Sequence, residues 1–239
     1  EQKTGSFKIR GAYYKIKSLT DDEKNKGVVA ASAGNHSQGV AFASHIENIP
    51  CTIVMPKNAS PAKVAATRGY GAKVVLEGTT YDESWAYAKK ISEESDSTII
   101  HAFDDSHVIA GQGVIGLEII EQLPNVDEIY VPIGGGGLVA GIITAVKEKN
   151  PQVKIIGVES SAYPAMKKSL ENNILETVSG DTTIADGISV KTPGKLTFDI
   201  VKQRIDKIVT VDDSDIINAM FLLMERSKAV VEPAGAVAL

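Results

Sequence analysis

The most constraining feature of the sequence is a regular alternation of short apolar runs with longer amphipathic stretches. The apolar runs are rich in valine and isoleucine and are bounded by glycine, proline or charged residues. Apolar side chains fill nearly every position of each run, as in parallel strands that are buried on both faces. We therefore predict strands at 28–31, 51–55, 73–76, 97–100, 129–133, 154–158 and 207–211.

The stretches between these runs carry helix signals. Thr20 and Thr80 each precede a glutamate by the spacing of a capping box, and Pro61 occupies a position typical of the first residue of a helix. Strands that alternate with helices predict βαβ units, and so an α/β fold with mainly parallel sheets. The longest irregular segment, 178–194, is expected to be functional or a crossover between domains. Further helices are expected at 36–46, 108–122, 138–149, 163–171, 195–203 and 213–227.

Composition excludes several classes of protein. Hydrophobic residues make up 43% and charged residues 23% of the 239 residues, values that rule out a disordered or collagen-like chain. A net charge of -5 argues against a general nucleic-acid binder. The single cysteine, Cys51, excludes a disulfide framework and a multi-cysteine zinc site. We see no apolar run of about 20 residues and no signal peptide, so we expect no membrane partner and a reducing, cytoplasmic location.

Four consecutive glycines, residues 134–137, follow a predicted strand and precede a predicted helix. Glycine lets backbone N–H groups approach an anion closely, and a helix N-terminus adds about half a positive charge. The pattern predicts a phosphate-binding loop rather than a plain turn. The missing Gly-Lys-Ser/Thr sequence argues against a nucleotide-hydrolysing P-loop. Gly135, Gly137 and Ala140 fit G-x-G-x-x-A, and Glu159 stands where a ribose-binding acid belongs, so a dinucleotide-dependent dehydrogenase stays an alternative.

Two further segments are candidate sites. Residues 32–39 follow the predicted strand 28–31 and open a helix with several consecutive small or polar residues, which favours an anion site such as one for a carboxylate over a simple helix cap. Lys8 stands beside Phe7, and a lysine that is removed from water becomes an amine nucleophile. Composition alone favours a solvated lysine at this position.

Other polar and small residues have simpler explanations. The four histidines lack the spacing of a metal site, and the run Asp104-Asp105-Ser106 is expected to cap the following helix. Gly111, Gly113 and Gly116 interrupt that helix at a cost of about 1 kcal/mol each relative to alanine. They indicate close packing of its backbone against another group, such as a ligand.

Taken together and in this order, the motifs resemble those of the fold-type II pyridoxal-phosphate enzymes, within the serine/threonine dehydratase and serine racemase group. The resemblance spans essentially the whole chain. It implies a tryptophan synthase β-like α/β fold, with two open, twisted, mainly parallel sheets and flanking helices. It also implies a small substrate-closing domain at 28–106, a large cofactor domain at 1–27 and 107–239, and a homo-oligomer, either dimer or tetramer. The segments that carry it are 4–12, 32–36, 109–113, 134–138, 184–187 and 231–236.

The resemblance implies a role for each motif. Lys8 carries pyridoxal 5′-phosphate as an aldimine and later moves the α-proton of an amino-acid substrate, and Phe7 and Asn35 flank the cofactor ring. The reaction is β-elimination of L-threonine, and less well of L-serine, to a 2-oxo acid and ammonia. The residues expected to hold the phosphate are Gly134, Gly135, Gly136, Gly137 and Leu138. Those expected to receive the substrate carboxylate are Ser32, Ala33, Gly34, Asn35 and His36.

Departures from the family pattern refine these expectations. Racemases of the group carry a sequence like Ser-Ser-Gly-Asn at the anion loop, and Ala33 replaces their second serine here. This replacement favours elimination over racemisation. Segments 101–105 and 185–194 also resemble the threonine dehydratase branch. No metal is expected, because the second carboxylate that racemase-like members carry six positions after Glu159 is Ala165 here.

Two further expectations concern the length of the whole protein and its function. The usual family segment before Gln2 and a Ser-Gly-Gly-Asn-like loop that the family places after Glu232-Pro233 are missing, so the chain is expected to be a piece of a protein of about 300 residues or more. A noncatalytic amino-acid-binding module stays an alternative, since it would keep the carboxylate loop without needing Lys8.

Overall fold

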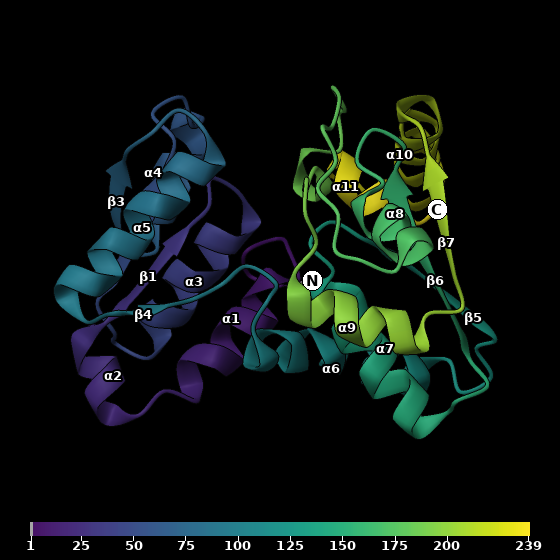
Figure 1. Ribbon diagram of the computed structural model, residues 1–239, viewed down its shortest axis with the longest axis horizontal. Helices are drawn as coiled ribbons and strands as arrows, with labels where there is room; N and C mark the ends of the chain where they lie inside the picture. Colours follow the sequence, from purple (N-terminus) through teal and green to yellow (C-terminus); the bar gives the residue numbers. More distant parts are fainter. Residues whose placement is uncertain (1) are drawn as a thin grey trace. The chain divides into compact units, whose positions relative to one another are not determined.

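The computed structural model describes residues 2–239, and these divide after Gln112 into two compact units. Each unit contains one sheet whose strands are all parallel (Figure 1). Helices separate successive strands along the chain. The predicted α/β class with two parallel sheets is therefore confirmed.

The sheet of the first unit has the strand order β3-β2-β1-β4. The central strand β1 pairs with β2 from Val28 opposite Cys51, and with β4 from Val28 opposite Thr98. Because the ladders are parallel, the loops that follow β1 and β4 leave the same edge of the sheet. The bounds of the strands are β1 (Val28–Ala31), β2 (Cys51–Met55), β3 (Lys73–Leu76) and β4 (Thr98–Ile99).

The four residues of β1 explain why the apolar runs are continuous. Val28 and Ala30 lie in one hydrophobic core, whereas Val29 and Ala31 lie in another. Successive side chains of a strand point to opposite faces, so both faces of the sheet are covered. One core is completed by α1 (Lys8–Lys17), α3 (Asn35–Ile46) and α4 (Pro61–Gly69), and the other by α5 (Tyr81–Ser95).

The predicted starts of three helices are confirmed, whereas one helix, α1, is not indicated by the sequence. Both predicted capping boxes are formed, by Thr20 ahead of α2 (Asp21–Lys26) and by Thr80 ahead of α5, and Pro61 is the first residue of α4. No helix was predicted over residues 8–17, where α1 lies. α6 (Ser106–Gln122) follows β4 and runs across the division between the units.

The second unit is built on the parallel sheet β5-β6-β7. Its predicted strands and helices are present with small shifts at their ends, and η1 and α11 are additional. The strands are β5 (Glu128–Pro132), β6 (Lys154–Ser160) and β7 (Lys207–Val211). The helices are α7 (Gly137–Lys149), α8 (Ala165–Asn172), η1 (Asp186–Ile188), α9 (Lys195–Arg204), α10 (Asp213–Ser227) and α11 (Pro233–Ala236).

The two compact units are not the same division as the expected domains. Packing places α1 with α3 in the first unit, whereas the expected domains assign residues 1–27 to the large domain and 28–106 to the small one. The expected division concerns which segment moves when substrate binds, so it stays a prediction. Among residues 2–239, no helix combines the length and the apolar character needed to cross a bilayer.

Candidate active site

Lys8 is the first residue of α1 and is half-buried. Its Nζ donates a hydrogen bond to the carbonyl oxygen of Ala102 at 3.3 Å and lies 5.3 Å from the centre of the Phe7 ring. A carbonyl oxygen and an aromatic face both attract a protonated amine. Of the expected site residues, Lys8 and Phe7 are thus brought together, while the contact with Ala102 was not predicted.

Glycines fix the helix that carries Lys8. A Cβ added at Gly39 of α3 would lie 3.1 Å from the carbonyl carbon of Lys8, and one added at Gly111 of α6 would lie 2.7 Å from the Cα of Gly11. The backbone N–H of Gly11 also donates to Oε1 of Gln112, a side chain that is only 1% exposed, at 3.2 Å. α1 therefore packs backbone to backbone against both α3 and α6.

The three glycines inside α6 pack against helices rather than a ligand. Gly111 meets α1, as above. A Cβ at Gly113 would lie 2.9 Å from the carbonyl oxygen of Gly141, and one at Gly116 would lie 2.9 Å from a methyl group of Val146. Both of these partners belong to α7. The close packing predicted from the sequence is confirmed, and α1 and α7 account for it.

The loop after β1 turns sharply into α3. Its first residue, Ser32, accepts the N–H of Gly34 through Oγ at 3.1 Å, and Ser37 Oγ donates to the carbonyl oxygen of Gly34 at 2.6 Å. Gly34 is the N-cap of α3, and it makes no side-chain cap. A simple side-chain cap, the alternative to an anion site, is therefore absent at the start of α3. An N-terminus without a side-chain cap suits a carboxylate, as the anion-site interpretation expects.

His36, on the first turn of α3, is 3% exposed. Its Nε2 lies 2.9 Å from the carbonyl oxygen of Ile100, so Nε2 carries the ring proton, and Nδ1 has no partner among the described residues. Burial, reinforced by the nearby charge of Lys8, lowers the pKa of His36 to about 3. A neutral imidazole offers no charge to a carboxylate, so the contribution expected of His36 rests on its backbone N–H.

In the second unit, the glycine loop follows β5 and leads into α7. Gly136 has a φ of +94° and is the N-cap of α7, again without a side-chain cap. The carbonyl oxygen of Gly135 accepts hydrogen bonds from Oγ1 of Thr197 at 2.7 Å and from the N–H of Gly194 at 3.1 Å. These donors, from the start of α9, neutralise a carbonyl that would otherwise repel an anion.

Packing behind the loop requires glycine. A Cβ at Gly136 would lie 2.7 Å from Cε of Met166, and one at Gly134 would lie 3.0 Å from the Cα of Ile188. The loop thus presents backbone without side chains at a helix N-terminus, next to Leu138 on the first turn. These residues fit a phosphate group, and Lys8 fits an aldehyde-bearing cofactor, so the chain holds both elements that pyridoxal phosphate needs.

Glu159, near the end of β6, is fully buried. Its two carboxylate oxygens accept the backbone N–H groups of Met166 at 2.8 Å and Lys167 at 2.9 Å, so the side chain caps α8. Burial raises the pKa of Glu159 to about 7 despite these bonds. A carboxylate engaged in this way does not reach a ribose hydroxyl, which removes the main support for the dinucleotide alternative.

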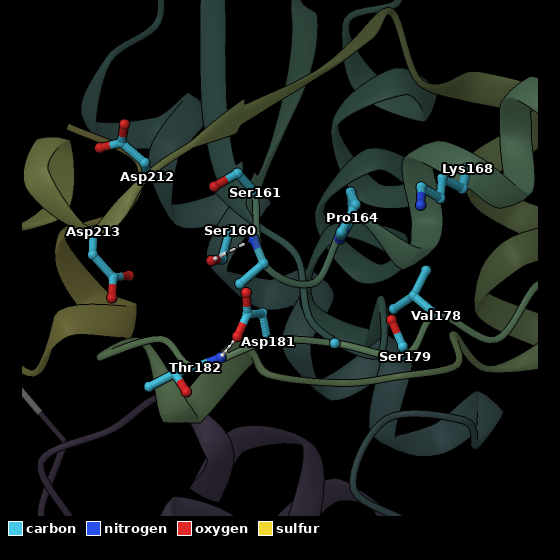
Figure 2. Close-up of a pocket in the computed structure, with 12 residues that line it drawn as sticks. Ser160, Ser161, Pro164, Lys168, Val178, Ser179, Asp181, Thr182, Asp212 and Asp213 are labelled. Carbon is cyan, nitrogen blue, oxygen red and sulfur yellow. Dashed lines mark hydrogen bonds between the residues drawn. The ribbon is translucent and has the colours of Figure 1, made fainter.

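A cavity of about 500 Å³ opens beside the carboxyl ends of β6 and β7 in the second unit (Figure 2). Its carboxylates have structural partners. Asp212 caps α10 by accepting the N–H of Ser214, and Asp213 accepts the hydroxyl of Thr183 at 2.6 Å. None of the residues that line this cavity belongs to the predicted site, so we do not assign it to the active site.

The predicted site residues are divided between the two units. The first holds Lys8, Phe7 and the loop 32–36, and the second holds residues 134–138. A lysine at the start of a helix and a glycine-rich loop at a helix N-terminus, both on parallel α/β sheets, are typical of the class of enzymes that bind a phosphate-bearing cofactor. The chain belongs to the family of pyridoxal-phosphate dependent enzymes, whose family model matches residues 1–239.

Known members of the family are similar over almost the whole chain. The L-threonine ammonia-lyase of Thermotoga maritima is 53% identical over 236 residues, which are 99% of this chain and 59% of that protein. The chain thus spans well under two thirds of the length of this relative. The processed form of threonine deaminase isoform 2 from Solanum lycopersicum superimposes with a TM-score of 0.97 and 41% identity, over 100% of this chain and 69% of that one. Maize serine racemase superimposes with a TM-score of 0.95 and 37% identity, over 98% of this chain and 71% of that one.

Proposed function

We propose that the chain catalyses pyridoxal-phosphate-dependent deamination of L-threonine, and less well of L-serine, to a 2-oxo acid and ammonia. The observation that carries the proposal is the 53% identity to an L-threonine ammonia-lyase over 99% of this chain. The position of Lys8 at the start of α1 supports it, as do the two loops that lead into α3 and α7, neither of which has a side-chain cap.

Lys8 is the catalytic residue in this proposal. Bound pyridoxal phosphate supplies an electron sink that stabilises negative charge at the α-carbon of the substrate. The amine of Lys8 holds the cofactor and then takes the α-proton, and the carbonyl oxygen of Ala102 offers it a hydrogen-bond acceptor. Phe7 and Asn35 would flank the cofactor ring.

Two loops orient the reactants. Gly134, Gly135, Gly136, Gly137 and Leu138 hold the phosphate through backbone N–H groups at the start of α7. The substrate carboxylate is bound by the segment 32–36 at the start of α3. Movement of the segment 28–106 on substrate binding excludes water and aligns the α-proton with Lys8.

The net reaction balances without an oxidant. Threonine loses its α-proton and its β-hydroxyl as water, which leaves an enamine. The released enamine takes up water and gives 2-oxobutanoate and ammonia.

We place the enzyme in the cytoplasm as a homo-oligomer.

A second candidate, amino-acid racemisation, is supported by the similarity to maize serine racemase. Racemisation needs a proton donor on the face of the ring opposite Lys8, and the side chain of Ala33 cannot provide one. We therefore favour elimination. The variant Ala33→Ser tests this reasoning, because it restores a hydroxyl at that position. A gain of D-amino acid, measured by chiral chromatography, is expected, and no gain counts against the role given to Ala33.

One spectrum separates the ammonia-lyase from a dehydrogenase and from a binding module. The chain with added pyridoxal phosphate is expected to show a visible absorption band that borohydride bleaches, and the band is lost in Lys8→Ala. Lys17→Ala is the matched control, since Lys17 lies on the same helix but is exposed and paired with Glu47 at 3.1 Å. Turnover of threonine is then followed by coupling 2-oxobutanoate formation to its reduction by NADH.

The proposal fails if no such band forms with excess cofactor, or if the band persists in Lys8→Ala. A band without threonine turnover would keep the cofactor assignment and remove the substrate assignment. A change in absorbance on adding NAD, with no response to pyridoxal phosphate, would favour the dehydrogenase.

A further inference from the structure

The segment 101–105, between β4 and α6, is tied to both ends of the helix that carries Lys8. The carbonyl oxygen of Ala102 accepts a hydrogen bond from Nζ of Lys8 at 3.3 Å. Two turns further along α1, Nζ of Lys15 forms an ion pair with the carboxylate of Asp105 at 2.9 Å. Asp105 is itself held because its Oδ1 accepts the backbone N–H of Val108 at 3.0 Å.

The side chain of His101 determines the path of this segment. Its Nδ1 accepts two backbone hydrogen bonds, from the N–H of Phe103 at 3.2 Å and from the N–H of Asp104 at 2.8 Å. The ring thereby acts as the side chain of an aspartate or asparagine does in an Asx turn.

Peptide planarity links this turn to Lys8. The carbonyl of Ala102 and the N–H of Phe103 belong to the same peptide group, and in a trans peptide they point in opposite directions. When His101 binds the N–H of Phe103, the oxygen of Ala102 is therefore directed away from the imidazole. That oxygen is the one that accepts the hydrogen bond from Lys8.

The ring is also held in place sterically. Trp85 meets it edge-on with ring centres 5.1 Å apart, and Phe103 meets it edge-on at 4.7 Å. Two N–H donors at Nδ1 require that the ring proton is on Nε2. Burial lowers the pKa of His101, so Nδ1 keeps its lone pair at neutral pH.

We propose that His101 is a positioning residue for Lys8: through Nδ1 it orients the peptide between Ala102 and Phe103, so that the Ala102 carbonyl holds the lysine amine. The inference rests on the proposed function of Lys8. His101 itself touches neither substrate nor cofactor in this role.

Two variants separate the acceptor at Nδ1 from the bulk of the ring. His101→Asn keeps an acceptor that reaches the same two N–H groups, whereas His101→Phe keeps an aromatic ring against Trp85 but has no acceptor. The readout is the rate at which the apoprotein captures pyridoxal phosphate on Lys8, measured by borohydride quenching and mass spectrometry of the modified peptide. Misplacement of a reacting group by about 1 Å costs on the order of a hundredfold, so we expect His101→Phe to slow capture at least about tenfold and His101→Asn by less than about threefold.

A second measurement does not depend on the cofactor. Long-range 15N–1H correlation spectra of the full chain are expected to show His101 as the Nε2–H tautomer at neutral pH. A proton on Nδ1 would overturn the proposal even if His101→Phe did not fold. Equal capture rates in the Asn and Phe variants would overturn it as well, while leaving the function of Lys8 intact. Wild-type protein that captures no cofactor would refute the proposed function, and this inference with it.

Discussion

The close contact between α1 and α6 allows a test in which the effects of packing and of helix propensity on stability have opposite signs. Gly111→Ala adds a methyl group 2.7 Å from the Cα of Gly11 and from the carbonyl oxygen of Arg10. Both are backbone atoms, which cannot rotate away as a side chain can, so α1 must move to restore an ordinary contact. Alanine gains about 1 kcal/mol over glycine in a helix interior, while overpacking costs about 1–3 kcal/mol. Because both contacts are with backbone atoms, we expect an overpacking cost in the upper half of that range, about 2–3 kcal/mol, and so a net loss of about 1–2 kcal/mol in the free energy of unfolding.

Gly69→Ala is the matched control. Gly69 also lies in a helix, α4, but an added Cβ there has nothing within 4 Å. This variant is expected to be as stable as the wild type or more stable by up to about 1 kcal/mol. The assay is urea unfolding followed by circular dichroism, combined with the rate of cofactor capture at Lys8. Capture should fall in Gly111→Ala, because the displaced helix carries Lys8, and remain unchanged in Gly69→Ala.

The refuting result is a Gly111→Ala variant that unfolds at or above the wild-type urea midpoint. It would mean that the two helices separate without cost, so that glycine at this crossing does not fix α1. A destabilised variant with an unchanged capture rate would refute only the second step, the transmission of the movement to Lys8.

Three further predictions concern single side chains. Burial raises the pKa of Glu159 from 4.5 to about 7, so the stabilisation that Glu159 contributes is present below about pH 4.5 and is lost as the pH rises through 7. Glu159→Gln should remove up to about 3 kcal/mol of this pH dependence of the free energy of unfolding, as measured by urea unfolding between about pH 5 and 8. Thr197→Val removes the 2.7 Å donor of the Gly135 carbonyl, which keeps the N–H of Gly194, and should cost about 0.5–1.5 kcal/mol, whereas Thr197→Ser should cost less; equal losses would argue against the hydrogen bond. Thr80→Ala removes the acceptor for the N–H of Glu83 at the start of α5 and should cost about 1 kcal/mol by thermal unfolding; an unchanged midpoint would show that the capping box contributes nothing.

Strands and capped helices could be predicted because their signals are local. β1 is apolar at every position since both faces of its sheet are covered, and Thr80 forms the capping box that its spacing indicates. α1 was missed for the opposite reason. Its sequence includes Gly11, a poor helix former, and the packing of that glycine against Gly111 is a tertiary contact that no local pattern reveals.

The candidate site was predictable to a similar extent. The glycines at 134–137 and the loop at 32–36 follow strands, where ligands of α/β proteins bind, and the resemblance to a known family identified Lys8. The backbone carbonyl of Ala102 could not be found in this way, because any residue can supply a carbonyl oxygen. The role of Glu159 as the cap of α8 could not be predicted either, because it depends on where the N–H groups of Met166 and Lys167 lie in space.

The long sequence separation between Lys8 and Ala102 bears on how the protein is made. The two residues are 94 positions apart, and β1 meets its second neighbour, β4, only when Thr98 arrives. At about 5–20 residues per second, a ribosome needs roughly 5–20 s to add that many residues. During this interval one edge of β1 lacks its partner, and the lysine amine lacks its carbonyl acceptor. A nascent chain is therefore exposed to strand-edge association first and becomes ready for its cofactor last.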